Sequence, residues 1–441
     1  MNHLSVKRQL IVAFTLLLVY PSFTEVLQRY LGTGMLRFLP LLAGAVLTVA
    51  FLIRESQTGQ LLLPINHSSE VVFWLVILAL AIYRNYDIRY LQNLGGIGIF
   101  IVTILLVPVL ACKTDWIDTF YHILMVFMAV HVAVTLLCYV FPAIYNNGIG
   151  PALGHIYTGD PGYMYGLWAN HGYNALCITI GLLIFTSNIM VSLKKLYITA
   201  TVLALFALLL TAKRGPLLFG AGALFVTWIL MMRMSREKIR KILLLAAGLI
   251  AIYAILSWKF PGTLRVFDRF SLDSTTDIST GRFGLYQEAF ALFLEHPLFG
   301  VGWSGFRFYY NTTVMGYDTF GAFDVHNIYV QLLCETGFIG IIVFLIIAFF
   351  SLSNAIRAML YWNELAGCNR ASIISMVNIQ LFFLMLGLTS NTLYVPTIFV
   401  PYIFSCAGTY AIRLRCKLAH TKSHHDVKKR LGITICNDAV D

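Results

Sequence analysis

The sequence predicts an all-α, polytopic integral membrane protein with about twelve transmembrane helices. Hydrophobic residues make up 59% of the 441-residue chain and charged residues only 12%, and the mean hydropathy is +0.78. Apolar runs of membrane-spanning length recur from one end of the chain to the other. Backbone groups in lipid must bond within their own segment, so these runs predict helices, and the sequence lacks the weaker alternation of a transmembrane β-barrel.

The first apolar run follows Lys7 and Arg8 and lacks the cleavage signal of a secretory leader, so we expect an uncleaved first helix. Hydropathy places spans near 9–28, 35–53, 70–83, 91–111, 117–141, 175–192, 196–212, 216–232, 242–258, 338–353, 371–388 and 395–412. We therefore divide the chain into three parts. They are an N-terminal bundle with a first outer loop (1–174), a core (175–412) that includes a second outer loop (259–337), and a basic cytoplasmic tail (413–441).

The net charge of +11 is unevenly distributed between the two sides of this bundle. With a cytoplasmic N-terminus, the inner segments hold Lys7, Arg8, Lys194, Lys195, Arg233, Arg236, Lys238, Arg240, Lys241, Arg357 and Arg370, and the tail adds Arg413, Arg415, Lys417, Lys422, Lys428, Lys429 and Arg430. This asymmetry follows the positive-inside rule and predicts a multi-pass protein of the cytoplasmic membrane. The basic tail is expected to contact anionic lipid headgroups, so the charge indicates membrane lipids and not nucleic acid.

Eight cysteines show no CxxC pair and no other metal-ligand spacing. Most fall in or beside spans, where cysteine behaves as a small apolar residue. We therefore expect neither a disulfide framework nor a metal centre.

The second outer loop contains the segment 282–295, "RFGLYQEAFALFLE". Its apolar residues at helical spacing are Phe283, Tyr286, Ala289, Phe290, Phe293 and Leu294. Ser279 or Thr280 can cap such a helix, and Pro297 follows its end. The segment predicts a short amphipathic helix that lies at the membrane surface or packs on the bundle.

Directly after it, Gly300, Gly302 and Gly305 spell G-x-G-x-x-G in "GVGWSG". As a dinucleotide site this motif requires a preceding strand and a following helix in a soluble parallel sheet, which the surrounding sequence does not provide. We expect the glycines to permit a tight backbone turn.

Lys213 and Arg214 lie between two closely spaced spans at their outer end, followed by Gly215 and Pro216. The positive-inside rule does not explain basic residues on the outer side of the membrane. The two readings are that these residues contact lipid phosphate as helix-end cations commonly do, or that they bind an anionic substrate.

Arg282 would open the surface helix, where backbone N–H groups and the dipole already favour an anion. Its guanidinium can bind phosphate through two parallel hydrogen bonds. The alternatives are a solvated charge or a salt bridge to Asp277 or Glu288. Together with Arg214, it describes a clamp for a pyrophosphate.

His326, in "DVHNIYVQLLCETG", precedes a span and has Asp324, Asn327 and Glu335 nearby in sequence. Histidine can accept a proton near neutral pH, and a neighbouring carboxylate can orient it. The alternative is a helix cap or a hydrogen-bonding surface residue.

Weaker polar candidates lie around these three. His171 and Asn174 in "WANHGYN" can hydrogen-bond sugar hydroxyls, and aromatic residues such as Tyr286 and Trp303 can contact a sugar, although interfacial aromatic belts explain such residues equally well. We also count Lys213 and Asn327 among the expected substrate-binding residues. His131 and Glu25 fall inside apparent spans, where ionisable groups are functional candidates, but neither has an evident partner.

Two stretches, "STGRFGLYQEAFALFLEHPLFGVGWSGF" and "HNIYVQLLCETGFIGIIVFL", resemble the shared core of the bacterial O-antigen ligase and O-antigen polymerase superfamily, and "TAKRGPLL" is similar to its upstream arginine motif. The similarity extends from Ala212 to about Phe344. It implies a metal-independent, inverting glycosyl transfer on the outer face of the cytoplasmic membrane, from a glycan on undecaprenyl pyrophosphate to an acceptor hydroxyl. By this resemblance Arg214 and Arg282 match phosphate-binding arginines, and His326 matches a histidine near the reacting centre. No cofactor is implied.

Within that superfamily we favour a polymerase of capsule, exopolysaccharide or O-antigen repeat units, which can work with a chain-length regulator. A ligase that transfers glycan to a lipid A core or to protein is the alternative. From another class, a polysaccharide transporter or flippase would require polar or broken helices near the bilayer midplane, and a scaffold subunit of an export complex is a third possibility.

Overall fold

The computed structural model describes residues 46, 114–154, 163–168, 170–232, 282–315, 324–361 and 367–430, with the backbone alone over 417–430. The expected spans near 9–28, 35–53, 70–83, 91–111 and 242–258 lie outside these residues, apart from residue 46, and so do Glu25, Ser279 and Thr280. Within the described part every regular element is helical.

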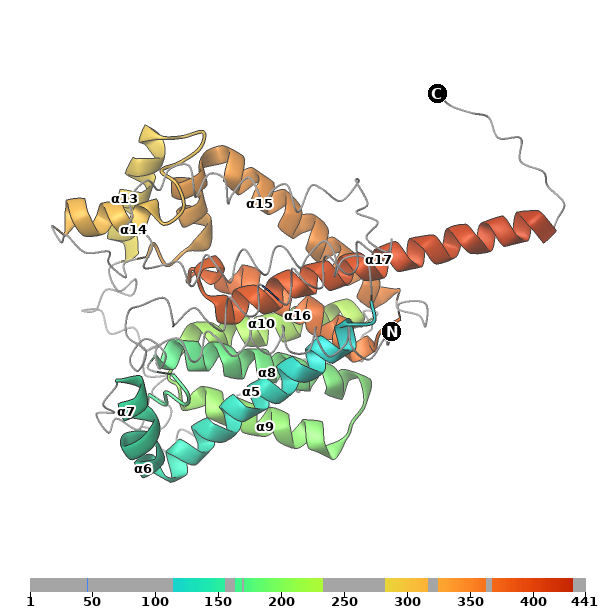
Figure 1. The fold of residues 1–441 in the computed structure, drawn as a ribbon, viewed down its shortest axis with the longest axis horizontal. Helices are drawn as coiled ribbons and strands as arrows, with labels where there is room; N and C mark the ends of the chain where they lie inside the picture. Colours follow the sequence, from blue (N-terminus) through green and yellow to red (C-terminus); the bar gives the residue numbers. More distant parts are fainter. Residues whose placement is uncertain are drawn as a thin grey trace.

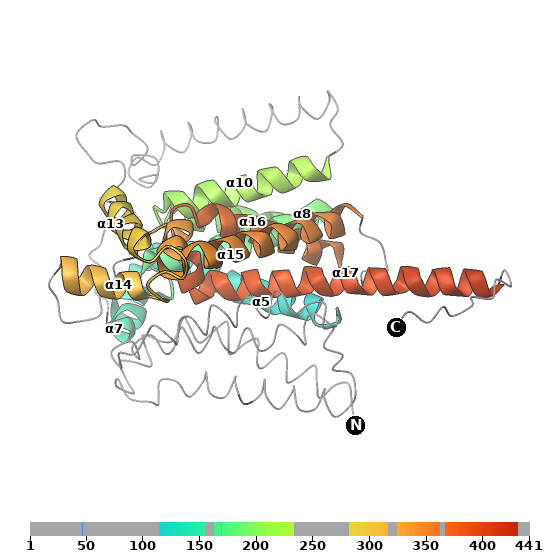
Figure 2. The ribbon, with the colours of Figure 1, turned by 90° about the horizontal axis from the view of Figure 1, so that it is seen from above.

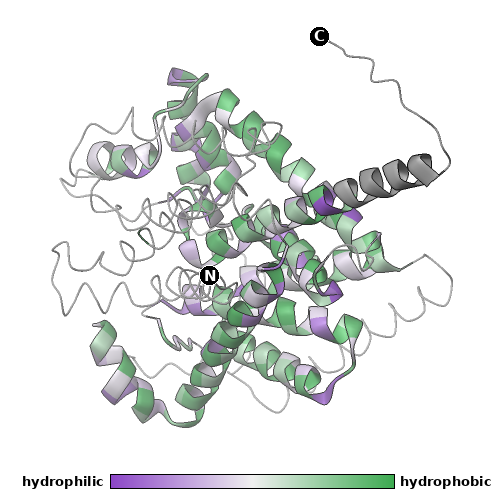
Figure 3. Ribbon diagram, turned by 45° about the vertical axis from the view of Figure 1, so that its right-hand side comes forward, coloured by the Kyte–Doolittle hydropathy of each residue, from purple (hydrophilic) through white to green (hydrophobic). Residues whose placement is uncertain are grey.

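Long helices form a bundle (Figure 1). They are α5 (Ile117–Val140), α8 (His171–Val191), α9 (Lys195–Leu209), α10 (Arg214–Met231), α15 (Ile328–Leu360), α16 (Arg370–Leu386) and α17 (Pro396–Arg430). Each expected span that falls on described residues coincides with one of them. By length and composition, α5, α8, α10, α15 and the first part of α17 can each cross a membrane, whereas α9 and α16 are shorter apolar helices. Figure 3 shows these helices as mainly apolar ribbons with polar residues concentrated near their ends. The all-helical membrane fold is thus confirmed for this part of the chain.

Helices α8 and α16 hold the bundle together. Helix α8 packs against α5, α9, α10, α16 and α17, while α16 packs against α5, α8, α10, α15 and α17. Seen from above, α15 and α16 lie between α10 and α17 (Figure 2). Apolar contacts join these neighbours: the rings of Phe383 in α16 and Tyr402 in α17 stack with their centroids 3.8 Å apart. Because α8 and α16 each contact five other long helices, they fix where the loops at both ends of the bundle begin and end.

Helix α15 begins ten residues before the expected span and breaks at Gly337, which has φ 65° and ψ −167°. At the break, backbone N–H and C=O groups of α15 lose their partners within the helix. They form hydrogen bonds with the "PLFGVG" segment (297–302) instead. Phe338 N donates to Pro297 O (2.8 Å), and Gly302 N donates to Glu335 O (2.9 Å). Both Gly300 (φ 66°) and Gly302 (φ 94°) adopt left-handed backbone, so the G-x-G-x-x-G segment is the predicted tight turn, and it docks on a broken helix.

Helix α13 (Arg282–Glu295) has the bounds expected of the amphipathic helix and packs on α15. Its buried residues are Ala289, Leu292 and Phe293. However, Phe283, Phe290 and Leu294 from the expected apolar stripe remain exposed. The helix thus buries only a narrow strip against the bundle and keeps a second apolar face outside.

Short elements complete the described chain. They are α6 (Pro142–Ile144), η4 (Tyr145–Ile149) and α7 (Gly150–Leu153) in the first outer segment, α14 (Gly305–Tyr309) and η5 (Tyr310–Val314) after α13, and η7 (Thr392–Tyr394) before α17. Helix α17 continues to Arg430 through the first part of the expected tail. Near the end of its apolar section, Arg415 donates to Thr114 Oγ1 (2.7 Å) and Arg413 to Asn354 Oδ1 (2.9 Å), which joins that section to α15 and to the start of α5.

Candidate functional site

A pocket of ≈ 440 Å³ opens at the end of the bundle where α8, α10, α13 and α15 begin and α16 ends. Four of the residues expected at the site line it: Lys213, Arg214, Arg282 and His326. They come from three segments that are far apart in the sequence. The pocket therefore brings together the cations and the imidazole that the sequence singled out.

Lys213 and Arg214 reach the pocket because the α9–α10 connection is very tight. The turn runs through Ala212, which has φ 52°, and α10 begins at Arg214, two residues earlier than the expected span. Pro216 then lies in the first turn of α10, where its missing N–H has no intrahelical partner to lose. Both basic side chains are half-buried, so they are held at the pocket wall and partly shielded from water.

Arg282 is the first residue of α13 and is also half-buried in the pocket wall. The N-terminus of a helix carries unpaired N–H groups and a partial positive charge. Since the guanidinium and this helix end lie together, an anion bound here is favoured by both.

His326 lies in a strained backbone conformation, with φ 58°, a region that few non-glycine residues adopt. Its neighbours on both sides are fixed. Val325 is fully buried, and its N–H donates to Gln331 Oε1 (3.3 Å). Asn327 caps α15 by accepting from Tyr329 N (3.0 Å) and Val330 N (3.2 Å). The anchored neighbours thus impose the conformation that presents the imidazole.

The pKa of His326 is lowered from its ordinary value of 6.5. Partial burial is the main cause, and the positive charges of Arg282, Arg307 and Lys213 add to it, whereas Asp324 acts in the opposite direction. The side chain is nevertheless exposed toward the pocket. At neutral pH the imidazole is therefore mainly neutral, which is the form that can accept a proton.

Asp324 also lines the pocket, but its carboxylate is bound to Arg307. Arg307 Nε donates to Oδ1 and Nη2 to Oδ2. Burial alone would lower the pKa of Arg307, but the Asp324 carboxylate outweighs it and the pKa is raised. The carboxylate that was expected to orient His326 instead anchors the segment before it. Sequence reasoning missed Arg307 because its partner lies 17 residues further along the chain.

Glu335, the second carboxylate near His326 in sequence, is fully buried and does not line the pocket. It accepts hydrogen bonds from Ser304 N (2.8 Å), Phe306 N (3.4 Å), Gln331 Nε2 (3.0 Å) and the Tyr394 hydroxyl. A carboxylate offers only acceptors, so four donors suit it. This network, formed by Glu335, Gln331 and Tyr394, ties the GVGWSG turn to α15 and η7.

The other expected substrate-binding residues do not line this pocket. Asn174 is fully buried, and its amide donates to Thr135 Oγ1 (2.9 Å) and Met164 O (3.1 Å). Trp303 stacks on Tyr394, with centroids 4.4 Å apart. His171 contacts the rings of Tyr163 and Tyr165.

Tyr286 is half-buried against the small cluster beneath α13, and Asn327 serves as a helix cap. His131 is fully buried between the rings of Phe127 and Trp168, and its nitrogens have no hydrogen-bond partner. It lies in α5, which does not line the pocket. These residues support the walls of the bundle and the loops around the pocket.

The pocket also contains polar residues that sequence reasoning missed. They are Asn170 before α8, and Thr389, Ser390 and Asn391 after α16. The signal was available in "LTSNTLYVP", a polar run between two apolar helices. These side chains can hydrogen-bond a polyhydroxylated ligand such as a sugar.

Among the described residues, no group of three or more His, Cys, Asp or Glu side chains could hold a metal ion. The described cysteines (Cys138, Cys177, Cys334, Cys368, Cys406 and Cys416) are free thiols. Cys112 and Cys436 lie outside the described part.

Residues 199–345 match the family model described as O-antigen ligase. No curated protein matches the chain. The matched residues include Arg214, Arg282 and His326, and they agree closely with the range of the resemblance predicted from the sequence. The recognition of this family is thus confirmed over that part of the chain.

Proposed function

Because residues 199–345 carry an O-antigen ligase family domain, we propose that the protein is a membrane glycosyltransferase. It takes a glycan from an undecaprenyl-pyrophosphate donor and transfers it to an acceptor hydroxyl on the outer face of the cytoplasmic membrane. The observation that carries this proposal is that Lys213, Arg214, Arg282 and His326 line one pocket. Cations suit the pyrophosphate, and a neutral imidazole suits the hydroxyl.

The reaction needs two kinds of assistance. The acceptor oxygen forms a bond to the anomeric carbon from the side opposite the leaving group, and the bond from that carbon to the phosphate oxygen breaks. Its electron pair leaves with the pyrophosphate, where Arg214, Arg282 and Lys213 stabilise the growing negative charge. Preorganised groups of this kind contribute about 3–4 kcal/mol each in partly dry sites.

The acceptor proton passes to His326. A well-placed general base contributes about 10²–10⁴-fold to the rate. The lowered pKa of His326 supports this role, since the imidazole is mainly unprotonated at neutral pH. Burial is the main cause of the lowered pKa, and Arg282 and Lys213, which would bind the leaving group, add to it.

The outer location is supported by the distribution of charge. The basic residues assigned to the inner side that lie near helix ends, Lys194, Lys195, Arg357 and Arg370, are at the other ends of α8, α9, α15 and α16. Under the positive-inside rule that end faces the cytoplasm. The pocket then faces outward, where no nucleotide donor is present and a lipid-linked donor is needed.

Within this reaction class we favour a polymerase of capsule, exopolysaccharide or O-antigen repeat units, since the polar and aromatic outer segments suit a glycan acceptor. The description of the family model names a ligase, which makes transfer to a lipid A core or to protein the second candidate. Deletion of the gene distinguishes them. Loss of long chains with single repeats still attached indicates a polymerase, whereas loss of all attached glycan with accumulation of lipid-linked polymer indicates a ligase.

Purified protein in liposomes with a synthetic lipid-linked donor and acceptor tests the activity itself. We expect Arg282→Ala and His326→Ala to reduce transfer at least about 100-fold. His296→Ala and Arg357→Ala are matched controls, because neither residue lines the pocket, and they should retain wild-type rates. Unchanged transfer by both site variants would refute the assignment.

A further inference from the structure

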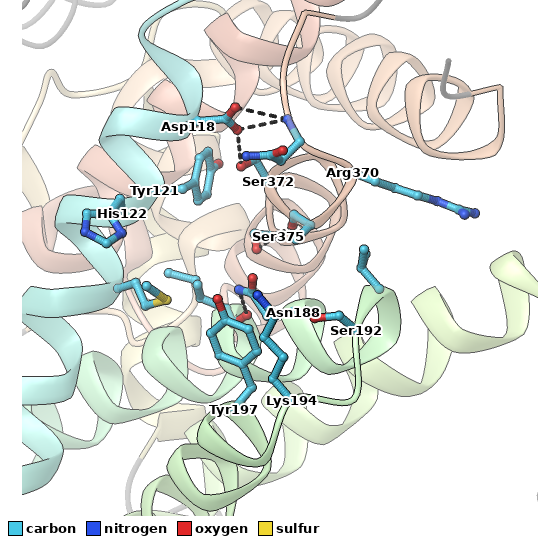
Figure 4. A pocket seen from close by; sticks show the side chains of 15 residues that line it. Asp118, Tyr121, His122, Asn188, Ser192, Lys194, Tyr197, Arg370, Ser372 and Ser375 are labelled. Carbon is cyan, nitrogen blue, oxygen red and sulfur yellow. Dashed lines mark hydrogen bonds between the residues drawn. The ribbon is translucent and has the colours of Figure 1, made fainter. Parts of the chain in front are cut away.

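A second pocket (Figure 4) is lined by the opposite ends of α8 and α16 from those at the first pocket. It measures ≈ 400 Å³ and opens where α5, α9 and α16 begin and α8 ends. Helix α8 contributes to both pockets and has 21 residues, so the two sites lie about 30 Å apart, at 1.5 Å per residue. The second pocket is therefore separate from the one that contains His326.

Its charge balance is positive. Lys194, before α9, and Arg370, at the start of α16, both line it. Among the described residues of its wall the only carboxylate is Asp118, and it is already bound within the protein. It accepts from Asn369 N (3.0 Å) and Ser372 Oγ (2.6 Å) and so satisfies the N-terminus of α16. Asp118 is thus engaged by the α16 N-terminus and by neither of the two cations.

Neutral polar groups surround the same space. Asn188 uses its amide N–H to bond Ile184 O (2.9 Å), which leaves its carbonyl oxygen as an acceptor. The Tyr197 hydroxyl points into the pocket beside Asn188, and Ser192 lies on the adjoining turn (Figure 4). Arg370 extends away from the centre, and because its side chain is exposed, rotation can bring the guanidinium over the pocket mouth. The site thus offers two cations and several hydroxyl groups.

Exposed apolar side chains lie close to Lys194 in the chain. Leu193 and Leu196, on either side of Lys194, expose 79% and 73% of their surface. Such exposure is costly in water but suits contact with lipid chains, and long basic side chains commonly reach from an apolar boundary to phosphate. The turn between α8 and α9 therefore presents hydrocarbon contacts and phosphate-binding groups side by side.

We propose that this pocket binds the phosphate of an anionic phospholipid headgroup. Lys194 and Arg370 pair with the phosphate, Ser192 and Tyr197 hydrogen-bond the headgroup, and Leu193 and Leu196 contact its acyl chains. This end of the bundle carries the basic residues of the inner side, and the cytoplasmic leaflet supplies anionic lipid. The proposal does not depend on glycan transfer, because its site and its ligand are different.

General attraction between basic residues and an anionic membrane is the competing explanation, and the chain offers matched controls for it. Lys195 is adjacent to Lys194 and equally exposed, and Arg357 lies on the same side of the bundle, yet neither lines the pocket. General attraction predicts that substitution of any of the four residues weakens lipid binding equally. A specific binding site predicts weaker binding only when Lys194 or Arg370 is replaced.

The test uses the purified full-length protein in detergent micelles. Phosphatidylglycerol, phosphatidylcholine and inorganic phosphate are titrated separately, and binding is followed by native mass spectrometry and by thermal stabilisation. We expect saturable binding of phosphatidylglycerol only. The double variant Lys194→Gln/Arg370→Gln should weaken it about 25-fold, from about fivefold per basic residue, and Lys195→Gln/Arg357→Gln by less than about twofold.

A further variant, Tyr197→Phe, should weaken binding by a smaller factor without changing the melting temperature of the lipid-free protein. Equal losses in the two double variants, or no loss in Lys194→Gln/Arg370→Gln, would overturn the proposal. Binding of inorganic phosphate as tight as that of phosphatidylglycerol would also overturn it, because the ligand would then be a soluble phosphate.

Discussion

His326 combines a strained backbone with a side chain placed among positive charges. Backbone strain of this kind costs about 1–3 kcal/mol and persists only where the surroundings enforce it. Here Val325, Asn327 and Ile328 enforce it through hydrogen bonds to Gln331, to the first turn of α15 and to Gly387 O. The side chain is thereby held toward Lys213 and Arg282, so position and protonation are set together.

The charges around His326 lead to a prediction about pH. If the neutral imidazole is the base, the transfer rate should rise with pH through the pKa of His326, with its inflection below 6.5, because the pKa is lowered. Lys213→Gln removes a positive charge that lowers this pKa, so the inflection should move to higher pH. Asp324→Asn should move it to lower pH, since Asp324 raises the pKa.

The pH profile of kcat/KM for the donor, which reports the pKa values of the free enzyme, checks both shifts. His296→Gln serves as the control and should leave the inflection in place. A profile that stays the same in Lys213→Gln and in Asp324→Asn would show that His326 does not govern it.

Sequence reasoning predicted the chemical side chains better than their supports. Arg214, Arg282 and His326 were recognisable because charged groups outside an apolar bundle are few. Asn174 was expected to contact sugar, yet it bonds Thr135 and Met164, and its buried position depends on a distant helix. Arg307 was missed for the same reason, because its partner Asp324 lies 17 residues further along the chain.

At the level of elements, the break in α15 determines how the outer loop attaches to the bundle. A Cβ atom at Gly337 would lie 2.3 Å from the Leu298 carbonyl carbon, and the residue has a positive φ. Gly337→Ala should therefore destabilise the protein by about 2 kcal/mol or more, through strain and overlap.

Gly284 in α13 is the matched control for this substitution, because nothing lies within 4 Å of a Cβ built there. Gly284→Ala should be neutral or stabilising by up to about 1 kcal/mol. Thermal unfolding of both variants measures the contrast. Equal melting temperatures for Gly337→Ala and Gly284→Ala would contradict the left-handed backbone and the close contact with Leu298 at Gly337.

The network formed by Glu335, Gln331 and Tyr394 leads to a prediction about Glu335. By accepting from Gln331 Nε2, Glu335 turns the Gln331 carbonyl toward Val325 N and Asn391. Glu335→Gln replaces one acceptor by a donor, so the Gln331 amide loses its fixed orientation and the segment that carries His326 is released. A misplacement of about 1 Å can cost about 100-fold in rate, whereas donor binding by the arginines should change little.

Kinetic measurements separate this positioning role from general destabilisation. We expect kcat to fall with little change in KM for the donor, and the loss in Glu335→Gln/Gln331→Met should be much smaller than the product of the single losses. Asn378→Leu removes a comparably buried hydrogen bond to Ser187 (2.9 Å) away from the pocket. It should lower the melting temperature without a selective loss of kcat, and the same pattern in Glu335→Gln would contradict the positioning role.

Considered as a whole, the molecule has a pocket lined by basic residues at each end of one bundle, with α8 and α16 contributing to both. The positive-inside rule assigns the end with Lys195 to the cytoplasm and the end with α13 to the outside. In a background without native cysteines, a membrane-impermeant thiol reagent should label Phe283→Cys in intact cells. It should label Lys195→Cys only after the cells are opened, and the reverse pattern would invert the topology.

Much of the overall architecture could be predicted from the sequence because apolar runs set the helix positions. The bounds of α13 were also predictable, since a polar loop and Pro297 flank an amphipathic pattern. The early start of α15 was not, because residues 328–336 contain polar side chains that become acceptable only when Glu335 and Gln331 find partners in other segments. Contacts between distant segments are therefore what hydropathy leaves undetermined.

The most direct test of the central claim separates donor binding from transfer in one set of variants. Donor affinity and single-turnover transfer are measured on purified wild type, Arg214→Gln, Arg282→Gln and His326→Gln. The account predicts that both arginine variants weaken donor binding and slow transfer, while His326→Gln binds donor normally and transfers at least about 100-fold more slowly. Normal transfer by His326→Gln, or undiminished donor binding and transfer in both arginine variants, would contradict it.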